Sequence, residues 1–384
     1  MVQERDLSEV KIRLSKPYLG DRQSLMGMIE EVLGRGFFVQ GKYVTQFETQ
    51  VAEYLAVKHA VAVSSGTAAL HIALLALGLK SNDEVIVPAY TFPATANVVE
   101  LVGAKPVFVD VDLETYNIQV DQIPKAMSPR TKAIIPVHLF GNPSDMGPIM
   151  EMAEIYGLAV VEDAAGALGS TYLGKKCGAL GTMGCFSFHP RKIVTTGEGG
   201  MVVTNDDELA DRLRSLRNHG IQMIGDRYDF SEAGLNYRMN EIGAALGVNQ
   251  MPEIQRMIYE RQKLAALYTD LLKDLFGIAF QKILVHSTTA WQAFVIRLAG
   301  RPAHPVIASL EEAGIEVNIG TYALPGVRFY REKYGYRPGD FLAAETLFRE
   351  AIAVPFYNSM APTFVKRVSQ SIREVLFSSD LREP

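Results

Sequence analysis

Short runs of β-branched and other apolar residues recur along the first half of the chain, and helix-forming stretches separate most of them. The runs expected to form strands are residues 61–63, 85–87, 106–109, 133–137, 158–161 and 200–204. Strands that alternate with helices usually pair in parallel, and such strands are apolar on both faces because helices cover both sides of the sheet. The pattern therefore predicts an α/β fold with a mostly parallel sheet between two layers of helices.

The pattern of residue types changes from about Pro252, where charged helical stretches replace the short apolar runs. Strands are expected at residues 293–298 and 314–317, and a terminal helix at residues 363–377. We interpret residues 1–255, including the N-terminal segment, as a large domain. Residues 256–384 are interpreted as a smaller α/β C-terminal domain that a long helix joins to the first.

Composition excludes several classes of protein. The 384 residues, 48% of them hydrophobic, can supply a sizeable core, and the formal net charge of -5 gives no positive field for nucleic acid. Two cysteines, Cys177 and Cys185, make a disulfide framework improbable and favour a reducing cytoplasm. With His189 they match no common zinc spacing, so we expect them to be packing residues and expect no metal site.

No segment has the features of a leader peptide or a membrane span. Residues 1–9 carry charges and contain no apolar core of a signal peptide. Apolar stretches such as residues 72–79 are far shorter than the roughly 20 residues that cross a bilayer. We therefore expect a cytoplasmic protein that does not enter the membrane.

One lysine stands in unusual surroundings. Lys192 follows Phe186 and Phe188 in a stretch rich in small and hydroxylic residues, and Arg191 directly precedes it. Phenylalanine walls would keep water from the amine, and a second cation would repel a proton, so both lower the pKa of the lysine. The neutral amine is then a nucleophile that forms Schiff bases. An ordinary solvated loop lysine is the alternative.

A turn of small residues, Ser-Ser-Gly-Thr-Ala-Ala-Leu at residues 64–70, follows an apolar run and opens a helix-forming stretch. The free N–H groups and the positive dipole end at a helix start suit a phosphate, and the Thr67 hydroxyl could add a hydrogen bond. Gly66 would let the phosphate oxygens approach the backbone. The same sequence is also an ordinary helix N-cap.

Two further segments place polar side chains beside apolar ones. Asp163, next to Glu162, ends an apolar run, and the carboxyl ends of strands are where open α/β sheets bind ligands. Asp163 could instead cap a following helix. Residues 234–241 lead into a helix of small residues, and Asn236 within them could cap its own backbone.

The segments around Lys192, Gly66, Asp163 and Asn236 together resemble the sugar aminotransferases of the DegT/DnrJ/StrS family. This family is a branch of the fold-type I enzymes, which are similar to aspartate aminotransferase. The resemblance runs from Leu14 almost to the C-terminus. It implies the fold of a fold-type I PLP transferase, bound pyridoxal 5′-phosphate, and a homodimer with shared active sites.

The resemblance implies catalytic roles for two residues. Lys192 is expected to hold the cofactor as a Schiff base and, after the amino acid donor releases it, to move a proton between Cα and the cofactor. Asp163 is expected to face the ring nitrogen, where its negative charge keeps the nitrogen protonated and the ring an electron sink. Glu162 receives no catalytic role.

Five residues are expected to complete the cofactor site by the same comparison. Gly66, Thr67 and Ser187 would surround the phosphate. The ring of Phe92 would stack on the pyridine face, although plain core packing is the alternative. Asn236 would reach the phosphate in the neighbouring subunit's site, which requires a dimer.

Two positions depart from the family's pattern. Gly166 stands where the family most often has a glutamine, so a side-chain partner for the cofactor or substrate is absent, and water or another residue must take its role. Residues 318–325 replace a His-Tyr pair and a further histidine that many sugar aminotransferases carry. His138 could be a substrate contact or a neutral histidine satisfied locally.

The resemblance implies transfer of an amino group from an amino acid, glutamate by analogy, to a keto-sugar nucleotide. The Ser-Phe-His form of the lysine segment is more similar to enzymes that aminate C4 than C3. Arg191, Arg217 and Arg238 are candidate partners for the diphosphate. Alternatives are a non-nucleotide keto substrate such as a keto-cyclitol, and a non-catalytic regulatory protein, which would predict a decayed cofactor site. A dehydratase of this family would have histidine in place of Lys192.

Overall fold

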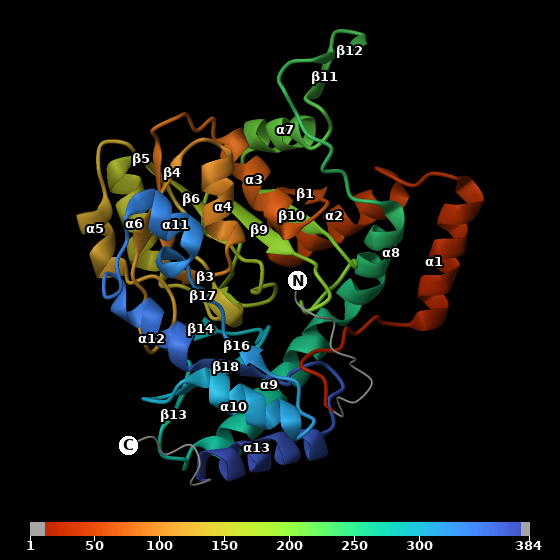
Figure 1. Cartoon of the computed structure of the whole chain (residues 1–384). Helices are drawn as coiled ribbons and strands as arrows, with labels where there is room; N and C mark the ends of the chain where they lie inside the picture. Colours follow the sequence, from red (N-terminus) through yellow and green to blue (C-terminus); the bar gives the residue numbers. More distant parts are fainter. Residues whose placement is uncertain (1–11, 378–384) are drawn as a thin grey trace.

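The computed structural model describes residues 12–377 and confirms the predicted α/β fold (Figure 1). Its central sheet has seven strands in the order β1-β10-β9-β6-β5-β2-β4. β10 pairs antiparallel with both neighbours, and the remaining pairs are parallel. The prediction for residues 1–9 lies outside the described residues. The strands are β1 (His59–Val63), β2 (Glu84–Pro88), β4 (Lys105–Val109), β5 (Thr131–Ile134), β6 (Ala159–Asp163), β9 (Met183–Ser187) and β10 (Gly200–Thr204).

Helices cover both faces of this sheet, as the apolar strands predict. Val61 and Val63 of β1 pack with α3, whereas Ala60 and Ala62 of the same strand pack with α2 and α8. The first face carries α3 (Gly66–Ala76), α4 (Ala94–Leu101) and α7 (Asp207–Leu216). The second carries α2 (Lys42–Leu55), α5 (Ile123–Ala126), α6 (Met146–Tyr156) and α8 (Glu241–Gln250), with α1 (Arg22–Arg35) outside α8.

The C-terminal part forms a second layered unit below the large sheet (Figure 1). Its antiparallel sheet has the order β13-β15-β18-β16; α10 packs against this sheet and against α13, and α13 packs against α9. The predicted terminal helix is confirmed as α13. These elements are α9 (Ile254–Leu272), β13 (Ile278–Phe280), β15 (Phe294–Leu298), α10 (Ala303–Glu312), β16 (Asn318–Ile319), β18 (Ala351–Val354) and α13 (Pro362–Phe377).

The predicted strand at residues 314–317 is wrong. Gly314 has a φ of 74° and turns the chain after α10, so that Ile315 forms only an isolated bridge with Ile12. The strand of this region, β16, starts at Asn318. Ile12 is buried in the core of the C-terminal unit through this bridge, and an apolar run that pairs with a distant segment looks the same in sequence as a sheet strand.

The long helix α9 links the two units. Ile254 and Ile258 at its start pack in the core below the large sheet, whereas Tyr268 and Leu272 at its end pack in the C-terminal core. We propose the boundary between the two domains between residues 255 and 256, in the first turn of α9. Within the described residues, no helix is both long and apolar enough to cross a membrane.

Small elements join the two units and extend from them. β3 pairs with β17, and β14 pairs with β7, so each pair ties the C-terminal part to the large sheet's surroundings. The exposed hairpin of β11 and β12 projects from the molecule beyond α7 (Figure 1). The remaining elements are β3 (Tyr90–Thr91), η2 (Val120–Gln122), η3 (Leu139–Gly141), β7 (Thr171–Tyr172), β8 (Lys175–Lys176), β11 (Ile221–Ile224), β12 (Arg227–Phe230), η4 (Met251–Glu253), β14 (Ser287–Thr288), β17 (Tyr322–Ala323), η5 (Leu324–Gly326), α11 (Arg328–Tyr334) and α12 (Leu342–Glu350).

Candidate active site

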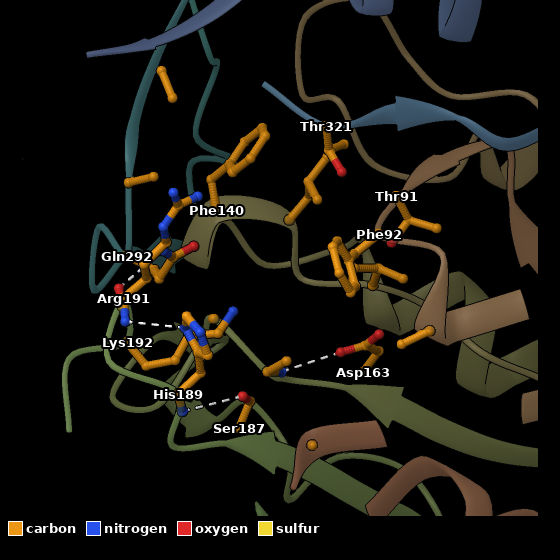
Figure 2. A pocket seen from close by; sticks show the side chains of 18 of the residues that line it. Thr91, Phe92, Phe140, Asp163, Ser187, His189, Arg191, Lys192, Gln292 and Thr321 are labelled. Carbon is orange, nitrogen blue, oxygen red and sulfur yellow. Dashed lines mark hydrogen bonds between the residues drawn. The ribbon is translucent and has the colours of Figure 1, made fainter. Parts of the chain in front are cut away.

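A cavity of about 640 Å³ lies where the parallel strands end and the C-terminal domain begins (Figure 2). Its volume is in the range of small-molecule sites, roughly 300–1,000 Å³. Asn236 is the only predicted site residue outside its lining. The predicted residues that the cavity does bring together are Gly66, Thr67, Phe92, Asp163, Ser187 and Lys192.

The first turn of α3 forms one wall. Ser65 caps the helix, because its Oγ accepts a hydrogen bond of 3.1 Å from the N–H of Ala68. The cap is therefore Ser65, and the exposed side chain of Thr67 faces the cavity. The N–H groups of residues 66 and 67 have no partner within the helix, since the first turn has no preceding carbonyl to bind. They remain available to an anion.

Gly66 is required by close packing against β9. A Cβ atom on Gly66 would lie 2.7 Å from the Cβ of Ser187, a distance that real side chains do not reach. The absence of a side chain lets the start of α3 and the Ser187 hydroxyl lie side by side. The Ser187 Oγ accepts only a long hydrogen bond of 3.4 Å, from the N–H of His189. Helix N–H groups and two hydroxyls thus converge at this end of the cavity.

Lys192 lies in the loop after β9, where its backbone N–H binds the carbonyl of His189 at 2.8 Å. Its Nζ has no hydrogen bond or ion pair within residues 12–377. Burial lowers the pKa of the Lys192 amine, and the charge of Arg191 lowers it further, while the carboxylate of Asp163 acts in the opposite direction. The lowered pKa of Lys192 predicted from the sequence therefore agrees with the surroundings of the amine in the structure.

The predicted phenylalanine walls of Lys192 are wrong. Phe186 and Phe188 do not line the cavity; both are buried in the core on the opposite face of the large sheet. Phe188 contacts Phe47 edge-on, with ring centroids 4.8 Å apart. The side chains of a strand alternate between its faces, so Ser187 turns toward the cavity and Phe186 turns away.

Asp163 ends β6 and is buried, with 6% of its surface exposed. Its Oδ2 accepts a hydrogen bond of 2.8 Å from the Thr95 hydroxyl, and its Oδ1 accepts one of 3.2 Å from the N–H of Ala165. Burial raises the pKa of this carboxyl, and the two hydrogen bonds and Lys192 oppose the rise. No helix directly follows β6, so the alternative of Asp163 as a helix cap is wrong.

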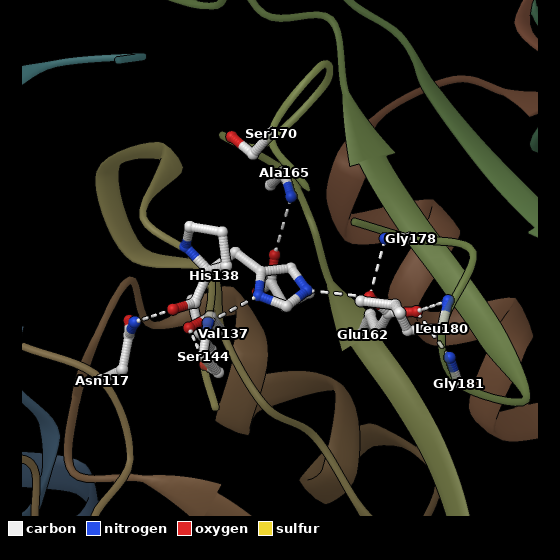
Figure 3. Close-up of polar contacts among 12 residues, drawn as sticks. Asn117, Val137, His138, Ser144, Glu162, Ala165, Ser170, Gly178, Leu180 and Gly181 are labelled. Atoms are coloured by element: carbon white, nitrogen blue, oxygen red, sulfur yellow. Dashed lines mark hydrogen bonds and ion pairs between the residues drawn. The ribbon is translucent and has the colours of Figure 1, made fainter. Parts of the chain in front are cut away.

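Glu162 points to the other face of β6 and holds its own network (Figure 3). His138 lies between Glu162 and Ser144: its Nε2 is 2.9 Å from Oε2 of Glu162, and its Nδ1 accepts from the N–H of Ser144 at 3.0 Å. The hydrogen bonds thus assign a neutral imidazole with the proton on Nε2. His138 is thus satisfied locally, and it also lines the cavity. Glu162 also accepts hydrogen bonds of 2.7 Å from the N–H groups of Gly178, Leu180 and Gly181.

The wall opposite β6 includes Phe92 and residues 318–321 of the C-terminal domain. Phe92 is 63% exposed, so plain core packing does not account for it, and its ring lies 6.5 Å from that of Tyr322. A Cβ on Gly320 would lie 2.4 Å from the hydroxyl of Tyr90, which also accepts from the N–H of Thr321 at 3.1 Å. This packing fixes the atypical segment at the rim of the cavity.

Asn236 and the three candidate arginines lie in different surroundings. Asn236 is exposed, and its Oδ1 accepts a hydrogen bond of 3.0 Å from Nε of Arg238. The cap of α8 is Asn240, so the alternative of Asn236 as a cap is wrong. Arg217 is buried in an ion pair with Glu48, which corrects its candidacy as a diphosphate partner. Arg191 alone among the three candidate arginines lines the cavity.

Several cavity residues had no signal in the sequence. Gln292 reaches the cavity from the C-terminal domain, and Thr95, behind the lining, binds the cavity residue Asp163 across 68 positions. Leu14 and Ser15 also line it, because the N-terminal segment is held there by a hydrogen bond of 2.8 Å between the N–H of Leu14 and the carboxylate of Glu316. These residues come together through tertiary contacts over long sequence distances, which local spacing does not encode.

Comparison with known proteins places this chain among aminotransferases. Residues 21–373 match the model of the DegT/DnrJ/EryC1/StrS aminotransferase family. The chain is 42% identical over 340 residues to GDP-perosamine synthase of Caulobacter vibrioides, covering 88% of this chain and 91% of that protein. It is 38% identical over 365 residues to the pleiotropic regulatory protein of Geobacillus stearothermophilus, covering 94% and 96%. The crystal structure of the aminotransferase TlmJ from Streptoalloteichus hindustanus matches with a TM-score of 0.88 at 29% identity, covering 95% and 98%.

Proposed function

The chain belongs to the DegT/DnrJ/EryC1/StrS aminotransferase family and is a pyridoxal-phosphate-dependent aminotransferase, and on this premise we propose that it transfers the amino group of glutamate to C4 of a keto-sugar nucleotide. The observation that carries the proposal is the presence of Lys192 and Asp163 in one cavity with a helix start suited to phosphate. The 42% identity with a GDP-perosamine synthase supports a nucleotide-linked sugar as the acceptor.

The residues of the cavity fit the cofactor. The contact between Gly66 and Ser187 leaves room for oxygens beside free helix N–H groups, and the amine of Lys192 is unpaired within the described chain. The cofactor supplies an aldehyde for covalent attachment and a pyridine ring that accepts electrons. We assign its phosphate to Gly66, Thr67 and Ser187, and its ring face to Phe92.

Two side chains would do the chemistry. The amine of Lys192 would hold the cofactor and then, when an amino acid replaces it, would move the proton at Cα of that amino acid. Its lowered pKa favours the neutral form that both tasks need. Asp163 would keep the ring nitrogen protonated, and the Thr95 hydroxyl would orient its carboxylate. The same steps in reverse would place the amino group on the keto-sugar.

The nucleotide diphosphate needs cationic partners at the cavity mouth. Arg191 is exposed and lines the cavity, so we assign it to the diphosphate. Arg238 lies outside this chain's cavity beside Asn236. In a homodimer with shared sites, both Arg238 and Asn236 would serve the partner's cavity. Both cysteines are buried and unpaired, which supports the cytoplasm as the location.

The proposed substrate is tested by incubating the purified enzyme with glutamate and a panel of keto-sugar nucleotides. We expect one member to be converted to an amino sugar nucleotide, which mass spectrometry and NMR would identify, including the carbon that carries the nitrogen. A keto-cyclitol belongs in the panel because Gly166 and residues 318–325 depart from the family's pattern. Turnover of the keto-cyclitol alone would replace the nucleotide sugar as substrate. Failure of every acceptor, with the cofactor bound, would favour a regulatory role like that named for the Geobacillus relative.

Shared sites are tested with a heterodimer of two tagged variants. If Asn236 serves the partner's cavity, a dimer of one Lys192→Ala subunit and one Asn236→Ala subunit has one site with both lesions and one with neither. We expect it to regain about half of the wild-type rate. Activity would be measured after isolation through both tags.

The matched control places both substitutions on one subunit and pairs it with a wild-type partner. Shared sites would then each carry one lesion, so only the residual activity of Asn236→Ala should remain. Sites built within one subunit predict the reverse result for the two heterodimers. That reversal would assign Asn236 to the site of its own subunit.

A further inference from the structure

A glutamine from the C-terminal domain lies where a side chain on residue 166 would be. A Cβ atom on Gly166 would lie 3.3 Å from Oε1, 3.4 Å from Cβ and 3.5 Å from Cγ of Gln292. A side chain at position 166 would therefore touch Gln292, which would have to shift by a few tenths of an ångström to admit it. Gln292 lines the cavity together with Gly166, and Figure 2 shows it beside Arg191 and Lys192.

The amide of Gln292 has hydrogen-bonding capacity left over. Its Nε2 donates one hydrogen bond, at 3.2 Å, to the backbone carbonyl of Arg191, the residue before Lys192. A carboxamide has two N–H donors and an oxygen that accepts. Over residues 12–377, neither the second N–H nor Oε1 has a partner. The side chain is thus anchored at one end next to the catalytic lysine and offers a donor to a ligand in the cavity.

The backbone around Gln292 is held firmly. Its N–H donates to the carbonyl of Phe140 at 3.0 Å. Nη1 of Arg261 donates to the carbonyls of Trp291 and Gln292 at 3.0 and 3.1 Å. Arg261 is 4% exposed and has no ion pair in the described part of the chain, and burial lowers its pKa to about 10. Burying a cation is costly unless it is hydrogen-bonded. The carbonyls of Trp291 and Gln292 are among the groups that satisfy Arg261, and these hydrogen bonds hold the segment in place.

Two bulky residues beside Gln292 adopt an uncommon backbone conformation. Trp291 has a φ of 52° and Phe140 a φ of 59°, both in the left-handed region. Side chains of this size rarely adopt it, and where they do, the surrounding structure imposes it, often at functional sites. The two residues flank the hydrogen bond between Gln292 and Phe140. The loops that contain Trp291 and Phe140 therefore meet at this hydrogen bond, which positions the Gln292 side chain beside Gly166.

We propose that Gln292 donates a hydrogen bond to an oxygen atom of the bound cofactor and so replaces the side chain that position 166 lacks. Oxygens of the cofactor accept hydrogen bonds, and the unused group of the amide includes a donor. Its anchor lies next to Lys192, and the amide contacts the position of Gly166 in the wall of the same cavity. The proposal rests on the cofactor site of the proposed function and is independent of the sugar substrate.

The test moves the amide from one position to the other. Gln292→Ala and Gly166→Gln would be made singly and together, with Gln292→Leu as a variant that keeps the volume without hydrogen bonds. Pyridoxal 5′-phosphate affinity and the visible absorbance of the bound cofactor would be measured by titration of each cofactor-free protein, with thermal unfolding as the check on folding. We expect Gln292→Ala and Gln292→Leu to weaken the affinity about tenfold, the effect of one hydrogen bond to a charged group.

Gly166→Gln alone should also weaken cofactor binding, because it collides with Gln292. The double variant should recover affinity and absorbance to within about threefold of wild type, since the new amide enters the space that alanine opens. An affinity unchanged in Gln292→Leu, or a double variant no better than the single ones, would overturn the proposal. A change confined to the KM for glutamate would also overturn the proposal, because the amide of Gln292 would then bind the substrate and not the cofactor. The sugar panel is not used here, so failure of the proposed acceptor leaves these results interpretable.

Discussion

Lys192→Ala is expected to abolish turnover, with a loss of at least about four orders of magnitude, because one side chain supplies both the covalent attachment and the proton transfer. The substitution removes an amine that has no partner in the described structure, and burial already disfavours its charged form. We therefore expect the fold to remain intact. Turnover assays would measure the loss of rate. Cofactor absorbance and borohydride trapping with peptide mapping would measure the loss of the covalent link, and thermal unfolding would check the fold.

The wild-type enzyme offers a pH control for this assignment. Because the pKa of Lys192 is lowered, its amine becomes neutral at a lower pH than that of an exposed lysine. The rate at which the cofactor-free protein forms a reducible link should rise with pH through this lowered pKa and then level off. A link trapped at another lysine, or one that forms only where ordinary lysines titrate, would contradict the role of Lys192.

Asp163→Asn should slow turnover by about two orders of magnitude or more while the cofactor still binds through its phosphate. Asparagine keeps the size of the side chain and can still accept from the Thr95 hydroxyl, but it lacks the negative charge that holds the ring nitrogen protonated. Single-turnover reaction with glutamate would isolate the slowed proton transfer. Near-normal rates would show that the charge of Asp163 has no catalytic role.

Glu162→Gln is the matched control, since this carboxylate is the neighbouring residue on the opposite face of β6. Its oxygens accept hydrogen bonds from three backbone N–H groups and from His138. In glutamine, an NH2 group would replace one of these oxygens and would face hydrogen-bond donors. We expect a loss of roughly 3 kcal/mol in the free energy of unfolding, because buried donors lose the charged acceptor that satisfies them. Enzyme that remains folded should keep most of its turnover. Equal catalytic losses in both variants would mean that the Asp163 effect is structural.

The alternation of apolar runs and helices determined the layers of the large domain. The run that leads to Asp163 could be placed with its carboxyl end at the edge where open α/β sheets bind ligands. The strand β9, which carries Ser187, was not among the predicted runs. A glycine followed by a hydroxyl at a helix start could likewise be connected with phosphate. These features are local, and periodicity and turn chemistry encode them directly.

The same local reasoning failed where a distant segment supplied the partner. Ile315 is buried because it pairs with Ile12 and not within a sheet strand, and Arg217 pairs with Glu48 and not with a ligand. Phe186 and Phe188 stand close to Lys192 in sequence, yet strand alternation sends them to the other side of the sheet. Neighbours in sequence are neighbours in space only within one face of one element.

By itself the sequence determined the α/β layers, the family's motifs and the residues expected at the cofactor: the lysine, the aspartate and the helix start. Only the tertiary structure decided which residues surround them. Thr95 reaches Asp163 and Gln292 reaches Gly166 because separate elements pack together. Local conformation depends on nearby residues, whereas an active-site wall depends on how the two domains meet, and no short pattern records that.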